Sequence, residues 1–110
     1  MEKSNESGKI YADKKIMSYI ENPSILGETT HKEKYYDFVK NGSDVKPLGK
    51  GNLKGIRYKD GGGYRVSGTE DGRYFQYHPK DYSLHKDEYY KITSGVSGKK
   101  RYDMKGHIID

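Results

Sequence analysis

Tyrosine dominates the apolar residues of this chain, and this restricts the kind of core that it can build. Apolar residues make up 31% of the 110 residues, 12 residues are tyrosine, and charged residues make up 34%. Burial of apolar surface must offset the loss of chain entropy, so this composition lies near the polar limit for folding. Large aromatic side chains together with 14 glycines are typical of a compact β-rich domain with tight turns.

The length suits a single domain with one core. The chain has no cysteine, which excludes disulfide scaffolds, thiolate zinc sites and cysteine nucleophiles. No apolar run approaches the roughly 18 residues that a membrane span needs, and the N-terminus has no apolar stretch of the signal-peptide type. We therefore expect no membrane-spanning segment.

The composition changes near Lys46-Pro47. Residues 1–46 contain 8 lysines and arginines and 8 acidic residues, whereas residues 47–110 contain 13 and 8, so the whole net charge of +5 lies in the second part. Residues 47–110 also contain 11 of the 14 glycines. We predict an N-terminal linker and helical segment over 1–46 and a basic, β-rich core over 47–110, both within one compact domain.

The N-terminal segment has the pattern of two helices. Apolar residues recur at helical spacing from Ile10 up to the Asn22-Pro23 step, which should end the first helix. Thr30 and Glu33 have the spacing of a capping box, and an apolar stripe follows them. The second helix should pack on the sheet, whereas we expect the segment before about Gly27 to be dispensable for activity.

The second part has the pattern of a β-meander, because short alternating segments are separated by glycine-rich turns. The fold class is therefore α+β, with N-terminal helices packed on one face of a twisted antiparallel sheet. The predicted strands cover residues 55–59, 64–67, 73–78, 89–93 and 101–103, with a candidate last strand at 107–109.

Alternation along these strands separates an apolar face from a cationic one. Arg57, Arg65 and Lys91 share the cationic face with Thr93, and Gln76 and His78 join them if the third strand keeps the same phase. A cationic face on a small sheet is suited to binding a polyanion. The alternative is an ordinary solvated face of an antiparallel sheet.

The residues between His78 and Ser94 could support RNA cleavage without a metal. His78 and His85 lie seven residues apart, and imidazoles can both deprotonate the ribose 2′-OH and protonate the leaving 5′ oxygen. Lys91 could neutralise the charge that develops on the phosphorane, and a hydroxyl of Thr93 or Ser94 could orient the phosphate. Two histidines on a loop can equally be solvated, and without cysteine their spacing disfavours a zinc site.

Their positions suggest different roles for the two histidines. We expect His85, in the loop that leads into the 89–94 strand, to be the first proton-transfer group, with His78 as its complement and Lys91 as the phosphorane stabiliser. No cofactor is expected. The cations predicted to bind RNA are Arg57, Arg65, Lys80, Lys99, Lys100 and Arg101.

Residues 50–104 resemble the C-terminal toxin domains of bacterial polymorphic toxins, which include contact-dependent growth inhibition proteins, LXG-type effectors and colicin-like bacteriocins. The resemblance lies in the segments Gly55–Tyr58, Gly63–Val66, Tyr77-His78-Pro79, His85, Tyr89–Gly95 and Gly98–Asp103. Many such domains have the barnase/EndoU/colicin/RelE-type ribonuclease fold. By residue type and order, the resemblance implies an active site of His78, His85, Lys91, Thr93 or Ser94, and Tyr102.

The resemblance also implies a biological setting. The domain would be secreted or displayed as part of a larger toxin, would cleave RNA, with tRNA as a candidate, in the cytoplasm of a target cell, and would be bound by an acidic immunity protein. Two other functions are compatible with the residues themselves. One is a non-catalytic nucleic-acid-binding module, for which the cationic face alone would suffice, and the other is a protein-binding domain that is basic.

Overall fold

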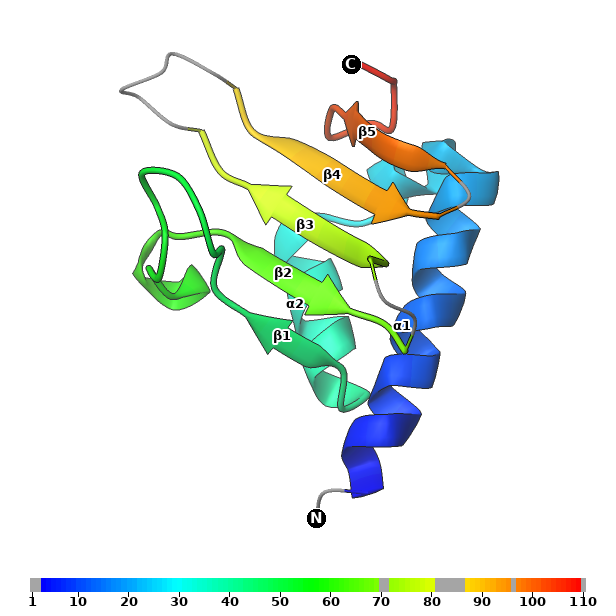
Figure 1. The fold of residues 1–110 in the computed structure, drawn as a ribbon. Helices are drawn as coiled ribbons and strands as arrows, with labels where there is room; N and C mark the ends of the chain where they lie inside the picture. The colour runs from blue at the N-terminus through cyan, green and yellow to red at the C-terminus, as the bar shows by residue number, and fades with distance from the viewer. Residues whose placement is uncertain (1–2, 70–71, 81–86, 96, 110) are drawn as a thin grey trace.

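A computed structural model describes residues 3–69, 72–80, 87–95 and 97–109, and it confirms the α+β class. Five antiparallel strands form a single meander sheet in the order β1-β2-β3-β4-β5. Both helices lie behind this sheet (Figure 1). The elements are α1 (Lys3–Glu21), η1 (Pro23–Glu28), α2 (His31–Lys40), β1 (Asp44–Lys46), η2 (Tyr58–Asp60), β2 (Tyr64–Ser67), β3 (Tyr74–His78), β4 (Tyr89–Ser94) and β5 (Gly98–Tyr102).

The capping box predicted for α2 is present. The Thr30 side chain accepts a hydrogen bond from the Glu33 amide at 3.0 Å, and Glu33 Oε1 accepts one from the Thr30 amide at 2.8 Å. These two bonds satisfy backbone donors that the first turn of a helix leaves free. They also fix the start of α2 so that Phe38 points into the core, where it is fully buried.

The core lies between the helices and one face of the sheet. Alternate residues of the central strands point to this face and are buried, as the burial patterns of β2, β3 and β4 show. Aromatic rings fill much of the space, with centroids of Phe38 and Phe75 5.6 Å apart and those of Phe75 and Tyr90 5.3 Å apart. Tyrosine side chains therefore supply much of the buried apolar surface of a core that has few aliphatic residues.

The helix α1 has a larger structural role than its sequence suggested. Ala12 and Ile16 are fully buried and Tyr19 is 3% exposed, all within the main core. Asp13 of α1 also contacts the β2–β3 connection, where the Thr69 amide donates to Asp13 Oδ1 at 3.1 Å. The expectation that residues before about Gly27 are dispensable is therefore not supported by these contacts. Among the described residues, no helix is long and apolar enough to cross a membrane.

The edge strand of the sheet differs from the prediction. Residues 55–59 do not form a strand; Tyr58–Asp60 form the short helix η2, and Ile56 is 39% exposed. The edge position is instead occupied by β1, which pairs with β2 in the register Val45↔Val66. The Asp60–Gly63 segment is consequently the end of η2 and not a hairpin turn, with Gly61 in the left-handed region at φ 99°.

The C-terminal segment lies beside β5. The predicted strand at residues 107–109 is reduced to an isolated bridge between Tyr102 and Ile108, supported by a hydrogen bond of 3.0 Å from the Ile109 amide to the Arg101 carbonyl. This short extension covers part of the outer edge of the sheet.

Candidate nucleic-acid interface

The face of the sheet that points away from the helices, called the outer face here, carries a line of polar and cationic residues. The strand registers Lys46↔Arg65, Arg65↔Gln76, Gln76↔Lys91 and Lys91↔Arg101 place one such residue on every strand. Neighbouring strands lie about 4.8 Å apart, so this line spans roughly 19 Å. These five residues are called the cross-sheet row: Lys46, Arg65, Gln76, Lys91 and Arg101.

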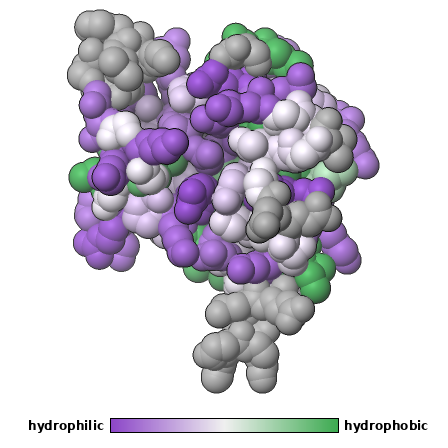
Figure 2. Space-filling view, in the orientation of Figure 1, coloured by the Kyte–Doolittle hydropathy of each residue, from purple (hydrophilic) through white to green (hydrophobic). Residues whose placement is uncertain are grey.

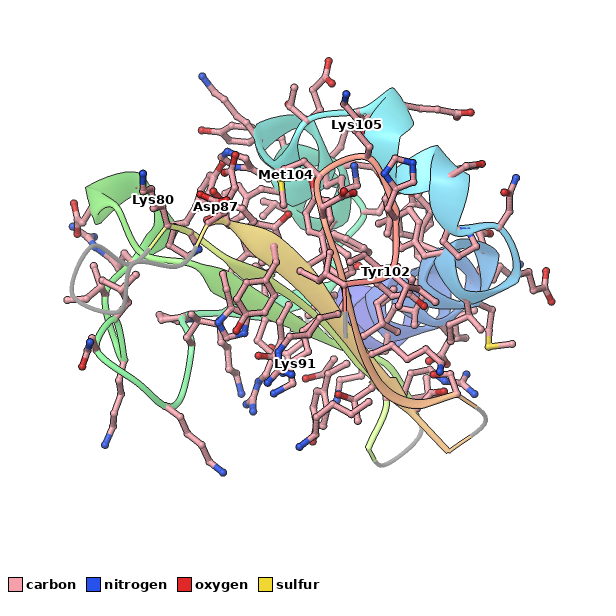
Figure 3. All side chains as sticks on the ribbon, turned by 90° about the horizontal axis from the view of Figure 1, so that it is seen from above. Lys80, Asp87, Lys91, Tyr102, Met104 and Lys105 are labelled. Carbon is pink, nitrogen blue, oxygen red and sulfur yellow. The ribbon has the colours of Figure 1, made fainter. Side chains whose placement is uncertain are left out.

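The outer face has the surface expected for a polar ligand. Figure 2 shows this side of the molecule, where hydrophilic residues dominate around the central strands. Figure 3 shows Lys91 on the opposite side of the sheet from Met104 and Lys105, which lie toward the helices. The outer face is therefore well separated from the apolar core.

Positive charges gather around Lys91 on the outer face. The pKa of Lys91 is lowered, first by partial burial and then by the positive charges of Lys99, Arg101 and Lys50. Lys99 lies on the outer face through its pairing with Thr93, and Lys50 comes from the loop after β1. A bound phosphate would relieve the repulsion among these groups, so the face is suited to a polyanion.

Both arginines of the row lie against tyrosine rings. The guanidinium carbon of Arg65 is 5.0 Å from the ring centroid of Tyr74, and that of Arg101 is 5.7 Å from the ring centroid of Tyr89. The Nε of Arg65 is buried and has no hydrogen-bond partner within the described ranges, so only the terminal N–H groups of this guanidinium could meet a phosphate. A guanidinium that stacks on a ring keeps its N–H edge available for a phosphate, because the contact uses only its flat face.

His78 lies at the end of β3, beside the row. Its ring stacks on Tyr89 with centroids 4.7 Å apart and an angle of 2° between the planes. Its Nε2 is 2.8 Å from Gln76 Oε1, so with the amide oxygen as acceptor this nitrogen carries the proton. His78 and Gln76 are two residues apart on one strand, about 7 Å along it, which puts the imidazole next to the row.

Several predicted site residues are brought together on the outer face. In β3, Gln76 and His78 alternate with the buried Phe75 and Tyr77, so both lie on the outer face. This is the alternation on which their predicted place beside the cations depended. Thr93 lies on β4 two residues from Lys91, on the same face. The predicted residues on this face are His78, Lys91, Thr93, Arg65, Lys99 and Arg101.

Other predicted residues do not join this group, because strand phase turns them toward the helices. Ser94 is 5% exposed and bonds to Ser97, with 2.9 Å between the two hydroxyl oxygens. Tyr102 is 2% exposed and pairs with buried Tyr90. Lys100 pairs with buried Ile92, so its side chain also lies on the side of the sheet that faces the helices.

Two more candidates, Arg57 and Lys80, are separated from the row. Arg57 lies before η2, since residues 55–59 are not a strand, and its Nε donates to Asp60 Oδ2 at 2.8 Å. Lys80 lines a groove of about 550 Å³ together with Met104 and Lys105, on the rim of the sheet. His85 lies outside the described residues, and its predicted role is untested.

The structure also reveals a histidine site on the helix side that the sequence did not indicate. The ring of His31, in the first turn of α2, stacks on Tyr77 with centroids 4.0 Å apart, and its Nδ1 lies 2.6 Å from the Tyr58 hydroxyl. The Tyr77 hydroxyl donates to Glu88 Oε1 at 2.6 Å. Burial lowers the pKa of His31, and burial raises that of Tyr58 to about 12.

This helix-side cluster is poorly suited to bind RNA. The adjoining groove of about 470 Å³ is lined by Glu28, Glu33 and Glu88, with Lys105 as the one lysine or arginine among its described lining residues. These carboxylates would repel the phosphates of an RNA strand in the groove. The cluster instead joins the start of α2 to η2, β3 and the start of β4. No signal in the sequence could have found it, because its members are far apart along the chain.

Within the described ranges, no group of three or more histidine, cysteine or acidic side chains is arranged to hold a metal ion. Comparisons of the chain with protein-family models, with curated proteins and with solved structures gave no match.

Proposed function

We propose that this chain is a metal-independent ribonuclease that binds its substrate across the outer face of the sheet. The observation that carries this proposal is the cross-sheet row, in which four cations and one amide lie in register beside His78. Lysine and arginine along one line can contact successive phosphates of an RNA strand. A histidine beside them adds a group that exchanges protons near neutral pH.

The reaction is a transesterification within the RNA. A base removes the proton of a ribose 2′-OH, the 2′ oxygen forms a bond to the adjacent phosphorus, and the bond from phosphorus to the 5′ oxygen breaks. The leaving 5′ oxygen takes up a proton, which gives a 2′,3′-cyclic phosphate and a 5′-OH. We assign one of the two proton transfers to His78, and the sequence prediction leaves the other to His85.

The remaining residues of the outer face would stabilise the transition state and hold the substrate. Lys91, at the centre of the charge cluster, would neutralise the phosphorane, and the Thr93 hydroxyl would orient a phosphate oxygen. Arg65 and Arg101 would bind flanking phosphates with N–H groups that their tyrosine partners hold in place. No step requires a metal ion or a cofactor.

The resemblance of residues 50–104 to bacterial toxin domains suggests a setting for this activity. In that setting the chain would be the ribonuclease part of a larger delivered toxin, acting on RNA such as tRNA in the cytoplasm of a target cell. An acidic immunity protein would complement the outer face, because its carboxylates could occupy the positions of the RNA phosphates.

Incubation of the chain with total tRNA in the presence of EDTA tests the proposal directly. We expect cleavage products that end in 2′,3′-cyclic phosphate, and we expect His78→Ala to slow their formation by about 10²-fold or more while the protein stays folded. Binding without cleavage would favour the non-catalytic nucleic-acid-binding module. Equal cleavage by wild type and His78→Ala would remove His78 from the mechanism.

Salt dependence tests the cross-sheet row separately from catalysis. Each phosphate contact contributes about one unit to the slope of log affinity against log salt concentration. The triple variant Arg65→Ala, Lys91→Ala and Arg101→Ala should therefore bind RNA more weakly and with a slope reduced by about three units. The matched control is Lys32→Ala, Lys40→Ala and Lys59→Ala, which removes the same charge from exposed positions elsewhere. An equal loss of slope in both variants would contradict a specific role for the row.

A further inference from the structure

Tyr89 is a half-buried aromatic residue of the outer face with a neighbour on each adjacent strand. His78 is its direct cross-strand partner on β3. Arg101 on β5 pairs with Lys91, which is two residues from Tyr89, so Arg101 lies diagonally across from Tyr89. Since β3 and β5 flank β4 on opposite sides, the imidazole and the guanidinium approach the tyrosine ring from opposite sides. Tyr89 therefore lies between the parallel ring of His78 and the guanidinium of Arg101, whose central carbon is 5.7 Å from the tyrosine ring centroid.

The geometry of this stack leaves the imidazole little freedom. The planes of His78 and Tyr89 are within 2° of parallel at a centroid distance of 4.7 Å. The hydrogen bond of 2.8 Å from His78 Nε2 to Gln76 then restricts rotation of the ring within that plane. One contact thus sets the plane of the imidazole and the other sets the direction in which its nitrogens point.

We propose that Tyr89 is a positioning residue that aligns His78 for proton transfer and Arg101 for phosphate binding. This inference rests on the proposed ribonuclease function. The ring of Tyr89 supplies both contacts through its faces, so the aromatic ring and not the hydroxyl carries the role. Tyr89 itself contacts no reacting atom.

The arrangement explains why a tyrosine occupies a position on the polar face of the sheet. Catalytic groups must be held close to their productive orientation, and displacement by about 1 Å can lower a rate by about 10²-fold. For His78 at the end of β3, this means that rotation of the imidazole must be restricted. A flat ring on the adjacent strand supplies that restriction, and the same ring orders the long side chain of Arg101 from its other side.

The test compares Tyr89→Phe, Tyr89→Leu and Tyr74→Leu in tRNA cleavage and in NMR. Tyr89→Phe should keep a kcat like that of the wild type, whereas Tyr89→Leu should lower kcat by about 10²-fold. Tyr74→Leu is the matched control, because it removes a ring of the same face that lies against Arg65, four residues from His78 on β3; it should raise KM and leave kcat unchanged. The ring-carbon proton resonances of His78, assigned with His78→Gln, should show a ring-current shift that Tyr89→Phe keeps and Tyr89→Leu loses.

The outcomes separate this inference from the function on which it rests. Cleavage by Tyr89→Leu at the wild-type kcat, or an unchanged His78 ring-current shift in that variant, overturns the positioning role and leaves the ribonuclease function intact. Loss of kcat in Tyr89→Phe as large as in Tyr89→Leu also overturns it, because the hydroxyl would then be the active feature. Absence of cleavage by the folded wild type overturns the proposed function and the positioning role together.

Discussion

Replacement of Lys91 by alanine should slow RNA cleavage by about 10²–10³-fold, the effect typical of removing one group that stabilises a developing oxyanion. Lys91 lies between Gln76 and Arg101 in the cross-sheet row, and its pKa is lowered by burial and by the positive charges of Lys99, Arg101 and Lys50. The charge of Lys91 is therefore poorly solvated before substrate binds. Its interaction with the phosphate becomes most favourable when the phosphorane forms. We expect the loss in kcat to exceed the loss in RNA affinity, because Lys46, Arg65 and Arg101 remain to hold the strand.

The measurement compares single-turnover cleavage of tRNA by Lys91→Ala, Lys91→Arg and Lys59→Ala at equal folded fraction. Lys91→Arg should retain part of the rate, since it keeps the charge but not the compact ammonium. Lys59→Ala removes an exposed lysine of η2 and should cleave at the wild-type rate. A Lys91→Ala rate close to that of Lys59→Ala would exclude Lys91 from transition-state stabilisation.

Removal of residues 1–24 should prevent the chain from folding. This deletion takes away α1, which supplies the fully buried Ala12 and Ile16 and nearly buried Tyr19. Without it, the ring of Phe75 loses the Tyr19 ring that packs 5.3 Å away. Truncating one buried aliphatic side chain to alanine already costs about 2–5 kcal/mol, and small domains are stable by only about 5–15 kcal/mol.

Point variants give a graded form of the same test. Ile16→Ala should lower the free energy of unfolding by about 2–5 kcal/mol in urea titrations followed by circular dichroism. Ile10→Ala is the matched control, because Ile10 lies on the same helix but is 45% exposed; it should change stability by about 0.5 kcal/mol or less. A deletion variant that unfolds cooperatively at a urea concentration near that of the full chain would show that α1 is peripheral.

Local patterns along the chain predicted much of the fold. Thr30 and Glu33 identified the start of α2 because a capping box is built from residues three positions apart. Alternation predicted that Arg65, Lys91 and Thr93 share a face, and the register of β2, β3 and β4 places them there. These features depend on contacts between residues that are close in sequence or on the fixed period of a strand.

The errors arose where contacts are distant in sequence. The segment at residues 55–59 alternates like a strand, but β1 takes the edge of the sheet beside β2, and Arg57 is consequently bonded to Asp60 instead of lying on the outer face. The helix α1 has a weak apolar stripe, so its place in the core followed only from the shape of the sheet that it covers. Propensity and period do not specify which of two segments pairs with a given edge.

The sequence by itself determined the α+β class, the start of α2 and the division of β2–β4 into an apolar and a cationic face, because each depends on short-range periodicity and capping. Only the tertiary structure decided that Lys46 and Arg101 complete one row with Lys91, that Ser94 and Tyr102 are buried, and that His78 stacks on Tyr89. Those features depend on which strands are neighbours and in what register they pair. Register is set by the packing of the whole core, because a shift of one residue would expose every buried side chain of a strand.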